Sequence, residues 1–438
     1  MSTPACPWRR TRRADLLRVA YVTHGCRLNQ FETDAVAAQF AAAGHQRAEG
    51  PGEADLVILN TCTVTQAADR EGRRLARRWA SSLGADRVVV TGCSAQRDPA
   101  PYAALGLRLV AGNSHKHQIP ELLDTTGVAV APPTSAARVN GLRVAGTSSH
   151  ARAYLRVQDG CNQSCTFCTL PSVRGTSTSV PLAVVREEAR GLTQRGHGEL
   201  VLTGAHLGSY GYDLTPRVSL PELIVAVLEA APTARVRLSS LEPRWVSPEL
   251  LRLLREEPRL CPHLHLPLQS GDDGVLARMR RAYRSAPYEA RALAAAEASP
   301  GFALGADFIV GFPGEDDAAF ARTMEMVERL PYTYGHVFSY SDRPGTPAAT
   351  LDGHVPPAVI RRRSAVLRAA LERKHEAFLA SQIGREVEIV VESVDDGVIR
   401  GTTERFLPAR ARAAATPGSR LRARVAAVRE DLLEANPC

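Results

Sequence analysis

The sequence predicts a mixed α/β protein of three successive domains: a parallel α/β domain, a partial (β/α)6 barrel and a small antiparallel β-barrel. Three observations lead to this prediction. Short apolar runs alternate with helical segments through the first two regions, as in parallel sheets. The second region has six such repeats, fewer than the eight of a closed TIM barrel. The final region changes to short strands of period two separated by turn residues, which is typical of a small antiparallel barrel.

The 438 residues are enough for two or three domains. We expect the first domain over 18–125, a linker rich in Pro, Ser, Thr and Gly over 126–150, the partial barrel over 151–381 and the small barrel over 382–432. The chain has no apolar run of membrane-spanning length, and its basic N-terminal stretch lacks the apolar core of a signal peptide. We therefore expect a cytoplasmic protein without a membrane partner.

Three cysteines in the first domain each follow a predicted strand. The strands are expected at 18–23, 55–60, 87–91 and 107–112, and Cys26, Cys62 and Cys93 come just after the first three. Because the carboxyl ends of parallel strands share one edge of a sheet, these cysteines are expected to lie at one edge, where ligand sites are found.

The partial barrel has its own regular pattern. Its strands are expected at 154–158, 199–204, 235–240, 263–267, 303–311 and 335–341. Helices are expected at 181–195, 219–231, 286–298 and 315–329, with an Arg-rich helix over 357–383. The motif "CNQSCTFC" follows the first strand, at the end of the barrel where such enzymes place their chemistry.

This motif brings Cys161, Cys165 and Cys168 into eight residues. Closely spaced thiolates hold iron–sulfur clusters, and three of them leave one iron of a four-iron cluster open to a small molecule. S-adenosylmethionine (SAM) is the known partner of this arrangement. The alternative is structural zinc, with these cysteines and a histidine such as His206 as ligands. The position of the motif in the barrel and the aromatic Phe167 beside it favour the cluster.

The net charge of +8 suggests a polyanionic partner, and almost all of the positive charge is arginine; Lys116 and Lys374 are the only lysines. Arginine binds phosphates and stacks on bases, so RNA suits this composition, although a compositional bias would also produce it. In the small barrel, a basic surface that binds RNA is expected, with a solvated strand face as the alternative. Its residues are Arg410, Arg412, Arg420, Arg422 and Arg424.

The segments "CNQSCTFC", "THGCRLNQFET", "VILNTCTVT" and "VTGCSAQ" together resemble the radical SAM methylthiotransferases, over nearly the whole chain. The resemblance implies a C-terminal RNA-binding barrel called TRAM and two 4Fe–4S clusters. Cys161, Cys165 and Cys168 would hold the radical SAM cluster, and Cys26, Cys62 and Cys93 an auxiliary cluster. One SAM would give a methyl group to sulfur on the auxiliary cluster. A second would be cleaved to a radical that abstracts hydrogen from the substrate, with no side chain acting as a catalytic acid or base.

The resemblance also implies residues that contact SAM. They lie near the carboxyl ends of the barrel strands, on the cysteine motif or, for Asp307, on the fifth strand facing the pocket, and each polar one is also a plausible loop cap. They are Phe167, Thr203, Gly204, Ser240, Glu242, Gln269, Ser270 and Asp307. Three further cysteines, Cys6, Cys261 and Cys438, match no cluster motif and are expected to have no role in the site.

Family members act on tRNA adenosines next to the anticodon or on an aspartate of a ribosomal protein, and the positive charge favours tRNA. The segment "NTCTVTQAADREGRR" is most similar to the branch that modifies N6-threonylcarbamoyladenosine. The alternatives are the branch acting on N6-isopentenyladenosine and a non-catalytic, metal-containing RNA-binding protein. The expected partners are therefore tRNA and an electron donor, and not DNA.

Overall fold

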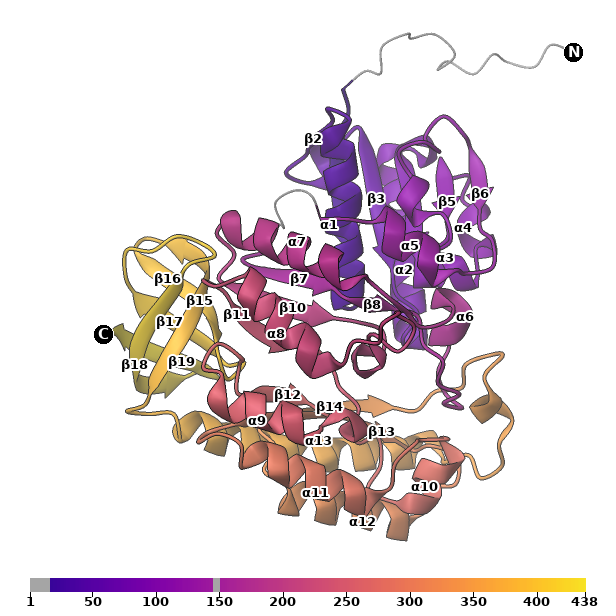
Figure 1. Ribbon diagram of the computed structural model, residues 1–438. Helices are drawn as coiled ribbons and strands as arrows, with labels where there is room; N and C mark the ends of the chain where they lie inside the picture. Colours follow the sequence, from indigo (N-terminus) through magenta and orange to yellow (C-terminus); the bar gives the residue numbers. More distant parts are fainter. Residues whose placement is uncertain (1–15, 145–149) are drawn as a thin grey trace, which may run out of the picture. The chain divides into compact units, whose positions relative to one another are not determined.

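The computed structural model describes residues 16–144 and 150–438, which form two compact units (Figure 1). The N-terminal unit comprises most of the chain up to Pro133, and the C-terminal unit comprises all described residues from His150 onward together with Val64–Gln66 and Thr134–Asn140. The predicted fold class is confirmed: a parallel α/β sheet, six barrel strands and a closed C-terminal barrel are all present. No helix in the described part of the chain is long and apolar enough to cross a membrane.

The N-terminal unit is built on a six-stranded, wholly parallel sheet of order β2-β1-β3-β4-β5-β6. Its strands are β1 (Arg18–Thr23), β2 (Gln46–Arg47), β3 (Leu56–Thr61), β4 (Val88–Gly92), β5 (Leu109–Ala111) and β6 (Gly127–Ala129). Its helices are α1 (Arg27–Ala42), α2 (Gln66–Leu83), α3 (Cys93–Arg97) and α4 (Ala100–Ala103). The four predicted strands correspond to β1, β3, β4 and β5.

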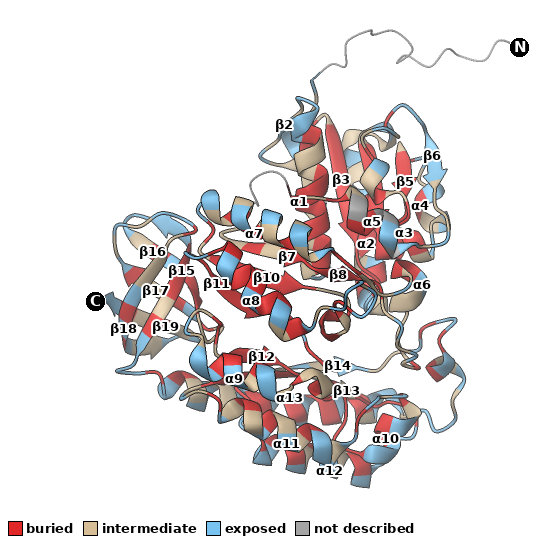
Figure 2. Ribbon diagram, viewed as in Figure 1, coloured by how far each residue is buried: buried red, intermediate tan, exposed pale blue. Residues whose placement is uncertain are grey.

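Burial explains why these strands form. Strand β3 is buried along its whole length, as Figure 2 shows in red, so its near-continuous apolar run is that of a central parallel strand. Leu59, Val88 and Val90 from β3 and β4 pack with Ala76 of α2 and with Tyr102. Strand β6 belongs to the segment expected as a linker. It pairs with β5 at the edge of the sheet, so the sheet extends into that segment.

The C-terminal unit contains six parallel strands in two three-stranded sheets, β11-β10-β7 and β12-β13-β14, with a parallel bridge from Val236 to Leu260 between β11 and β12. The strands are β7 (Arg152–Arg156), β10 (Glu199–Thr203), β11 (Arg235–Leu238), β12 (His263–His265), β13 (Ala303–Val310) and β14 (Tyr334–Ser339). A short antiparallel pair, β8 (Gln158–Asp159) and β9 (Thr178–Ser179), follows β7. These six parallel strands confirm the predicted partial barrel.

Helices α11 and α13 pack on one side of β13 and β14 (Figure 1). The helices of this unit are α5 (Ser135–Gly141), α6 (Leu170–Arg174), α7 (Leu182–Gln194), α8 (Leu220–Ala230), α9 (Pro248–Glu256), α10 (Asp273–Arg278), α11 (Ser285–Ala296), α12 (Asp317–Arg329) and α13 (Pro357–Ala380). Helix α9 was not predicted. Ser247 caps its first turn by accepting a hydrogen bond from the Leu250 amide, and its apolar face is buried. Short 3-10 helices lie in both units. Those of the N-terminal unit are Pro51–Glu53, Ala85–Arg87 and Lys116–Gln118, and those of the C-terminal unit are Leu207–Ser209, Pro243–Trp245 and Pro347–Thr350.

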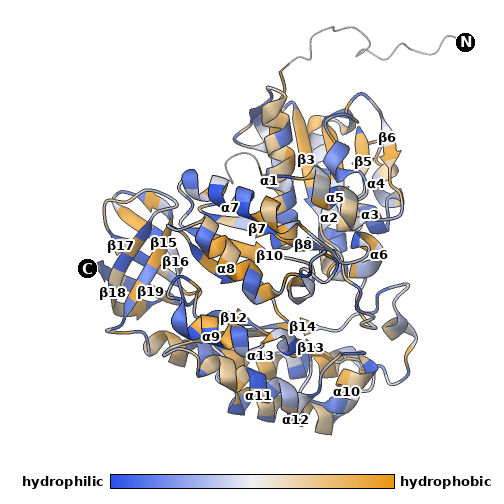
Figure 3. Ribbon diagram, viewed as in Figure 1, coloured by the Kyte–Doolittle hydropathy of each residue, from blue (hydrophilic) through white to orange (hydrophobic). Residues whose placement is uncertain are grey.

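The C-terminal barrel is closed, with the strand order β15-β16-β17-β19-β18. Its strands are β15 (Glu386–Asp395), β16 (Val398–Thr403), β17 (Pro408–Arg412), β18 (Arg420–Arg429) and β19 (Leu432–Pro437). Apolar residues alternate with polar ones along these strands, as Figure 3 shows, and the apolar set fills the barrel interior. One pairing differs from the antiparallel prediction: β17 and β19 are parallel, because β18 and β19 form a hairpin whose second strand returns beside β17.

Buried charges join the two barrels of this unit. Glu199 of β10 is fully buried and pairs with Arg235 and Arg237 of β11 at 2.7 Å each. Burial alone would raise the pKa of Glu199, but the charges of Arg237 and Arg235 outweigh burial and hold that pKa well below its ordinary value. The two arginines also donate to the backbone oxygens of Thr402 and Thr403 in the C-terminal barrel, at 2.9 and 2.8 Å. This network fixes the C-terminal barrel on the strands of the larger one.

Candidate functional site

A tight backbone turn begins the loop that carries Cys161, Cys165 and Cys168, hereafter the loop triad. Gly160 has φ +74°, and a Cβ there would lie only 1.9 Å from the Thr176 carbonyl oxygen, so no other residue fits without moving the backbone. Its amide donates to Asp159 Oδ1 at 2.7 Å. The loop therefore leaves the short strand β8 in one defined direction.

Asp159 is itself held in place by two buried arginines. Arg138 Nε and Arg174 Nη1 donate to the carboxylate at 2.9 and 3.0 Å. Burial would raise the pKa of Asp159, yet the charges of Arg138 and Arg174 hold the pKa well below its usual range. The carboxylate is thus ionised, and it ties α5, α6 and the start of the cysteine loop together.

Each sulfur of the loop triad accepts one N–H hydrogen bond. The donors are the Gln163 amide to Cys161 Sγ at 3.4 Å, Arg281 Nη1 to Cys165 Sγ at 3.1 Å and the Leu170 amide to Cys168 Sγ at 3.4 Å. Burial raises the pKa of the Cys168 thiol to about 11, so its thiolate needs a cation close by. Three sulfurs with N–H donors, and no fourth cysteine paired with them among the described residues, suit an iron–sulfur cluster with one open iron.

A charged group adjoins the loop triad. Glu242 Oε1 lies 2.7 Å from Arg281 Nη2, and Glu242 Oε2 lies 3.1 Å from His206 Nε2. Burial opposes ionisation of this carboxyl, but the His206 hydrogen bond and the Arg281 charge lower the pKa of Glu242 to about 2. Trp245 Nε1 also contacts His206 Nε2, at 3.4 Å. The Glu242 carboxylate, which shares Arg281 with Cys165, is therefore charged at neutral pH.

Sequence reasoning selected Glu242 but missed Arg281 and assigned His206 only as an alternative zinc ligand. These three side chains come from loops after different strands, so no local spacing links them. Gln158 was missed for the same reason. Its Nε2 donates to the Gly160 oxygen at 2.7 Å, and its Oε1 accepts the His206 amide at 2.8 Å. It thereby joins the loops that follow β7 and β10.

Two of the predicted SAM contacts, Thr203 and Gly204, end β10 next to Gln158. Thr203 is buried, and its hydroxyl donates to the Val201 oxygen at 3.0 Å. A Cβ on Gly204 would lie 2.9 Å from Gln158 Oε1. The backbone at Gly204 therefore approaches its neighbours more closely than a larger residue allows.

Gln269 has the features of a ligand-binding residue. It adopts φ +69°, unusual for a residue with a side chain, and its backbone bonds both Asp307 and Ile309 of β13. Its Oε1 is buried and has no hydrogen-bond partner among the described residues. A buried amide oxygen of this kind is costly unless a bound molecule donates to it, which fits a hydroxyl-bearing cofactor such as SAM. Ser270 instead accepts the Asp272 amide at 3.2 Å, as a loop cap does.

The other three residues expected to contact SAM lie in different parts of the barrel. Phe167 packs edge-on against Phe312, with ring centroids 6.4 Å apart. Ser240 is exposed after β11. Asp307 on β13 lies 3.1 Å from His265 Nε2. Of these three residues, only Phe167 lies on the loop that carries the loop triad.

The N-terminal unit carries Cys26, Cys62 and Cys93, hereafter the strand-end triad. Cys26 precedes α1, Cys62 directly follows β3, and Cys93 opens α3 directly after β4. Strands β1, β3 and β4 are adjacent and parallel, about 4.8 Å apart. All three cysteines therefore lie at the carboxyl edge of the sheet, as the strand pattern predicted.

Two glycines allow the strand-end triad to converge. Gly25 has φ +149°, and a Cβ there would lie 3.0 Å from Cys62 Cβ. Gly92 has φ +104°, and a Cβ there would lie 2.3 Å from the Thr61 backbone oxygen. Both positions are in backbone conformations that favour glycine, so the turns that present Cys26 and Cys93 depend on these residues.

Polar contacts orient the cysteines of this edge. Cys26 Sγ donates to Asn29 Oδ1 at 3.3 Å, and Asn113 Nδ2 donates to Cys93 Sγ at 3.4 Å. Asn29 Nδ2 in turn lies 3.3 Å from Asn60 Oδ1.

A buried ion pair contacts one of these asparagines, Asn60. Lys116 Nζ donates to Asn60 Oδ1 at 3.1 Å and to Glu32 Oε2 at 2.5 Å, and both charged side chains are fully buried. One of the two lysines of the chain therefore supports the edge that carries the strand-end triad.

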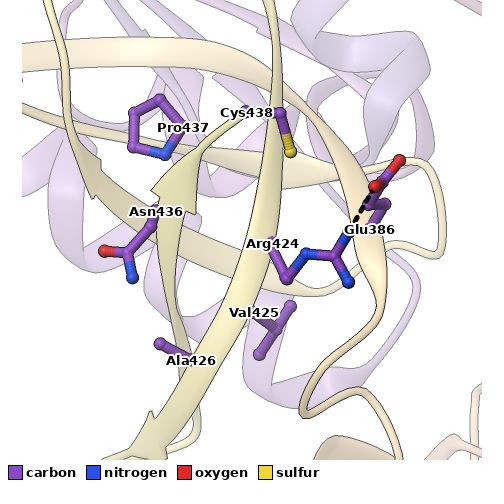
Figure 4. A pocket seen from close by; sticks show the side chains of 7 residues that line it. All are labelled: Glu386, Arg424, Val425, Ala426, Asn436, Pro437 and Cys438. Carbon is purple, nitrogen blue, oxygen red and sulfur yellow. Dashed lines mark hydrogen bonds and ion pairs between the residues drawn. The ribbon is translucent and has the colours of Figure 1, made fainter.

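The predicted RNA-binding arginines are divided between free and paired positions. Arg424 donates to Glu386 at 2.7 Å on the rim of a hollow of about 380 Å³ (Figure 4), and Arg420 donates to Glu388 at 3.0 Å. Arg410 pairs with Glu434. Arg412 and Arg422 are exposed, with no ion pair among the residues that the structure describes.

The other cysteines lie outside both triads. Cys261 is buried, and burial raises the pKa of its thiol to about 11. Cys438 is exposed and lies in the hollow drawn in Figure 4. Cys6 lies outside the described residues.

Comparison with known protein families defines the class. Residues 18–109 match the uncharacterized protein family UPF0004, and residues 155–327 match the radical SAM superfamily. Among solved structures, the radical SAM methyltransferase TsrM from Kitasatospora setae has the same fold, with TM-score 0.55, 14% identity and coverage of 76% of this chain and 74% of that one. The fold and the matched family model are those of a radical SAM enzyme.

Comparison with curated proteins narrows this class. Threonylcarbamoyladenosine tRNA methylthiotransferase MtaB of Thermotoga maritima is 34% identical, over 88% of this chain and 89% of that protein. MtaB of Bacillus subtilis is 33% identical over 89% of each. A tRNA-2-methylthio-N(6)-dimethylallyladenosine synthase of Parafrankia sp. is 36% identical, over 84% of this chain and 76% of that protein. The chain belongs to the radical SAM methylthiotransferase family, in the group of transferases that act on tRNA.

Proposed function

We propose that this protein adds a methylthio group to the 2-position of N6-threonylcarbamoyladenosine in tRNA. Relatives named for this activity match the chain along nearly its whole length, which is the observation that carries the proposal. The six cysteines of the two triads supply the ligands that such a reaction needs. A tRNA substrate also favours the cytoplasmic location expected from the sequence.

In this proposal the loop triad holds the 4Fe–4S cluster that binds SAM. The three N–H donors to its sulfurs support thiolate ligands, and Arg281 adds a positive charge beside Cys165. The strand-end triad holds a second 4Fe–4S cluster. When bound, the first cluster and SAM supply a carbon radical that removes an unactivated hydrogen, and the second cluster supplies sulfur.

The residues of the barrel position SAM. The ionised Glu242 would attract a positively charged group of the cofactor, and Arg281 and His206 fix the orientation of this carboxylate. The buried Gln269 Oε1 accepts from a cofactor hydroxyl. Thr203 and Gly204, at the carboxyl end of β10, would line the same pocket.

Exposed arginines of the C-terminal barrel, which we take to be a TRAM-like module, bind tRNA phosphates. Arg412 and Arg422 are the best placed for this contact, because the carboxylates around them are already paired with other arginines. An electron donor completes the set of partners.

The experiment that tests the proposal is nucleoside mass spectrometry. Anaerobically reconstituted protein is incubated with SAM, a reductant and tRNA that carries either N6-threonylcarbamoyladenosine or N6-isopentenyladenosine. We expect the methylthio product only from the first tRNA. A product only from the second would move the protein to the other branch, and no product from either, with SAM still cleaved, would contradict tRNA as the substrate.

A further inference from the structure

Two histidines and an aspartate converge on neighbouring strands of the larger barrel, and none of them belongs to either cysteine triad. They are His265 of β12, Asp307 of β13 and His336 of β14. Their ligand atoms all lie within 4.8 Å of one another, and His265 Nε2 is 3.1 Å from Asp307 Oδ1. Asp307 and His336 are direct partners in the β13–β14 register. We call these residues the strand cluster.

The strand cluster lies on the face of the strands that the outer helices do not cover. Leu264 and Leu266, which flank His265, are fully buried, and Tyr288 of α11 donates to the Leu266 oxygen at 2.6 Å. Because side chains alternate between faces along a strand, His265 points to the opposite, inner face. His336 is exposed and Asp307 partly exposed. The cluster is therefore partly accessible to solvent, through His336 and Asp307.

A second set of contacts fixes the ring of His265. Tyr334 Oη lies 3.1 Å from His265 Nδ1 and 2.8 Å from His263 Nε2. A Cβ on Gly305 would lie 2.1 Å from the Tyr334 ring, so this glycine makes the space for the tyrosine. A hydrogen bond at Nδ1 directs Nε2 toward Asp307, as in metal sites whose histidines are oriented through the other ring nitrogen.

We propose that the strand cluster binds a divalent first-row metal ion such as Zn²⁺ or Fe²⁺. Two histidines and one carboxylate form a ligand set that both ions use. Two ligands at 2.0–2.1 Å from an ion in tetrahedral geometry are about 3.4 Å apart, close to the 3.1 Å between His265 and Asp307. Three protein ligands leave an open position toward the barrel interior, where an oxygen ligand can bind. The cysteines take no part in this site.

The simpler alternative is a His–Asp hydrogen bond with no bound ion. The chain offers a control for this alternative, because His354 Nδ1 lies 3.5 Å from Asp342 Oδ1 in a pair to which no described residue adds a third ligand. Both pairs join a histidine to an aspartate beside a tyrosine, and they differ in the additional histidine and in the burial of the His265–Asp307 pair.

The test is Zn²⁺ titration of the full chain by calorimetry, with both cysteine triads already loaded with iron and sulfide so that the six triad cysteines do not compete for zinc. We expect about one additional Zn²⁺ per chain. His336→Ala, a change at an exposed side chain, should abolish this binding, and His354→Ala should leave it unchanged. Tyr334→Phe should keep the stoichiometry and weaken the affinity about 10-fold or more.

Iron content and circular dichroism of each variant check that the fold and the clusters are intact. Absence of the additional Zn²⁺ in the wild-type protein would overturn the proposal. Equal binding by the wild-type and His336→Ala proteins, or its loss in His354→Ala, would overturn it as well.

Discussion

The two cysteine triads reach similar chemistry by different structural means. The loop triad lies within eight residues, on one turn that Gly160 and the buried Asp159 fix. The strand-end triad is dispersed from Cys26 to Cys93 and converges only because three parallel strands end at one edge. A local motif depends on the conformation of its loop, whereas a dispersed site depends on the stability of the whole unit. The triads should therefore respond differently to mutation.

The largest effect is expected from removing each triad completely. With all three loop-triad cysteines changed to alanine, SAM cleavage and methylthiolation should both fall to background. The same change in the strand-end triad should keep SAM cleavage and stop methylthiolation, because radical formation and sulfur supply are separate tasks. Anaerobic assays of 5′-deoxyadenosine and of the methylthio nucleoside measure the two steps. Methylthiolation by the strand-end variant would show that the second triad has no role in sulfur supply.

The strand-end triad should also be lost through a backbone change. Gly92→Ala places a Cβ 2.3 Å from the Thr61 oxygen at φ +104°, so the N-terminal unit should lose about 3 kcal/mol or more of unfolding free energy and its iron. Gly106→Ala is the control, since Gly106 has φ +64° but open space around it, and should cost only about 1 kcal/mol. Denaturant unfolding and iron analysis measure both effects. Full iron loading of the Gly92→Ala protein would contradict the claim that the strand-end triad depends on the backbone turn at Gly92.

Next in size is the buried ion pair of the N-terminal unit. Lys116→Met leaves the Glu32 carboxylate buried without its cation and should lower the unfolding free energy by about 3–5 kcal/mol. The double variant Lys116→Met/Glu32→Leu removes both charges and should recover most of this loss. Urea unfolding of the three proteins measures the difference. A double variant as unstable as the single one would mean that the lysine acts through packing and not through its charge.

A smaller effect is expected at the loop triad. Arg281→Lys keeps the charge but loses the planar fork that contacts Cys165 and Glu242 at once, so SAM affinity should fall about 10-fold. Arg284→Lys, on the exposed side of the same segment, is the matched control and should bind SAM normally. Equilibrium binding of SAM to the reconstituted proteins tests this difference. Equal SAM affinities in the two variants would show that Arg281 does not contribute to SAM binding.

The smallest effect concerns RNA. Arg422→Ala should weaken tRNA binding and lower the salt dependence by about 0.7–0.9 in log–log slope, the value of one lost phosphate contact. Arg424→Ala should change little, because Glu386 already occupies this guanidinium. Binding of labelled tRNA over a range of salt concentrations measures both variants. Equal losses of tRNA affinity in the two variants would indicate that the Arg424–Glu386 ion pair breaks when RNA binds.

The success of sequence reasoning differs between the two triads and the residues around them. Both triads could be located, because spacing identifies the loop triad and strand ends identify the other. The contacts of Arg281, His206 and Gln158 could not, since they arise where loops after different strands meet. Strand β6 has three residues and depends on pairing with β5, so it carries no periodicity of its own. Helix α9 was a different kind of omission, because Ser247 and Pro248 already mark its start.

The most direct test of the account is the iron content of anaerobically reconstituted protein. The wild type should bind about eight iron atoms per chain and absorb in the visible range, and each triple-alanine variant should retain about four. If the two cluster sites are independent, the loss of one cluster leaves the other intact. A strand-end variant with the full iron content, or a colourless wild-type protein containing stoichiometric zinc, would contradict the claim that this chain builds two cluster sites.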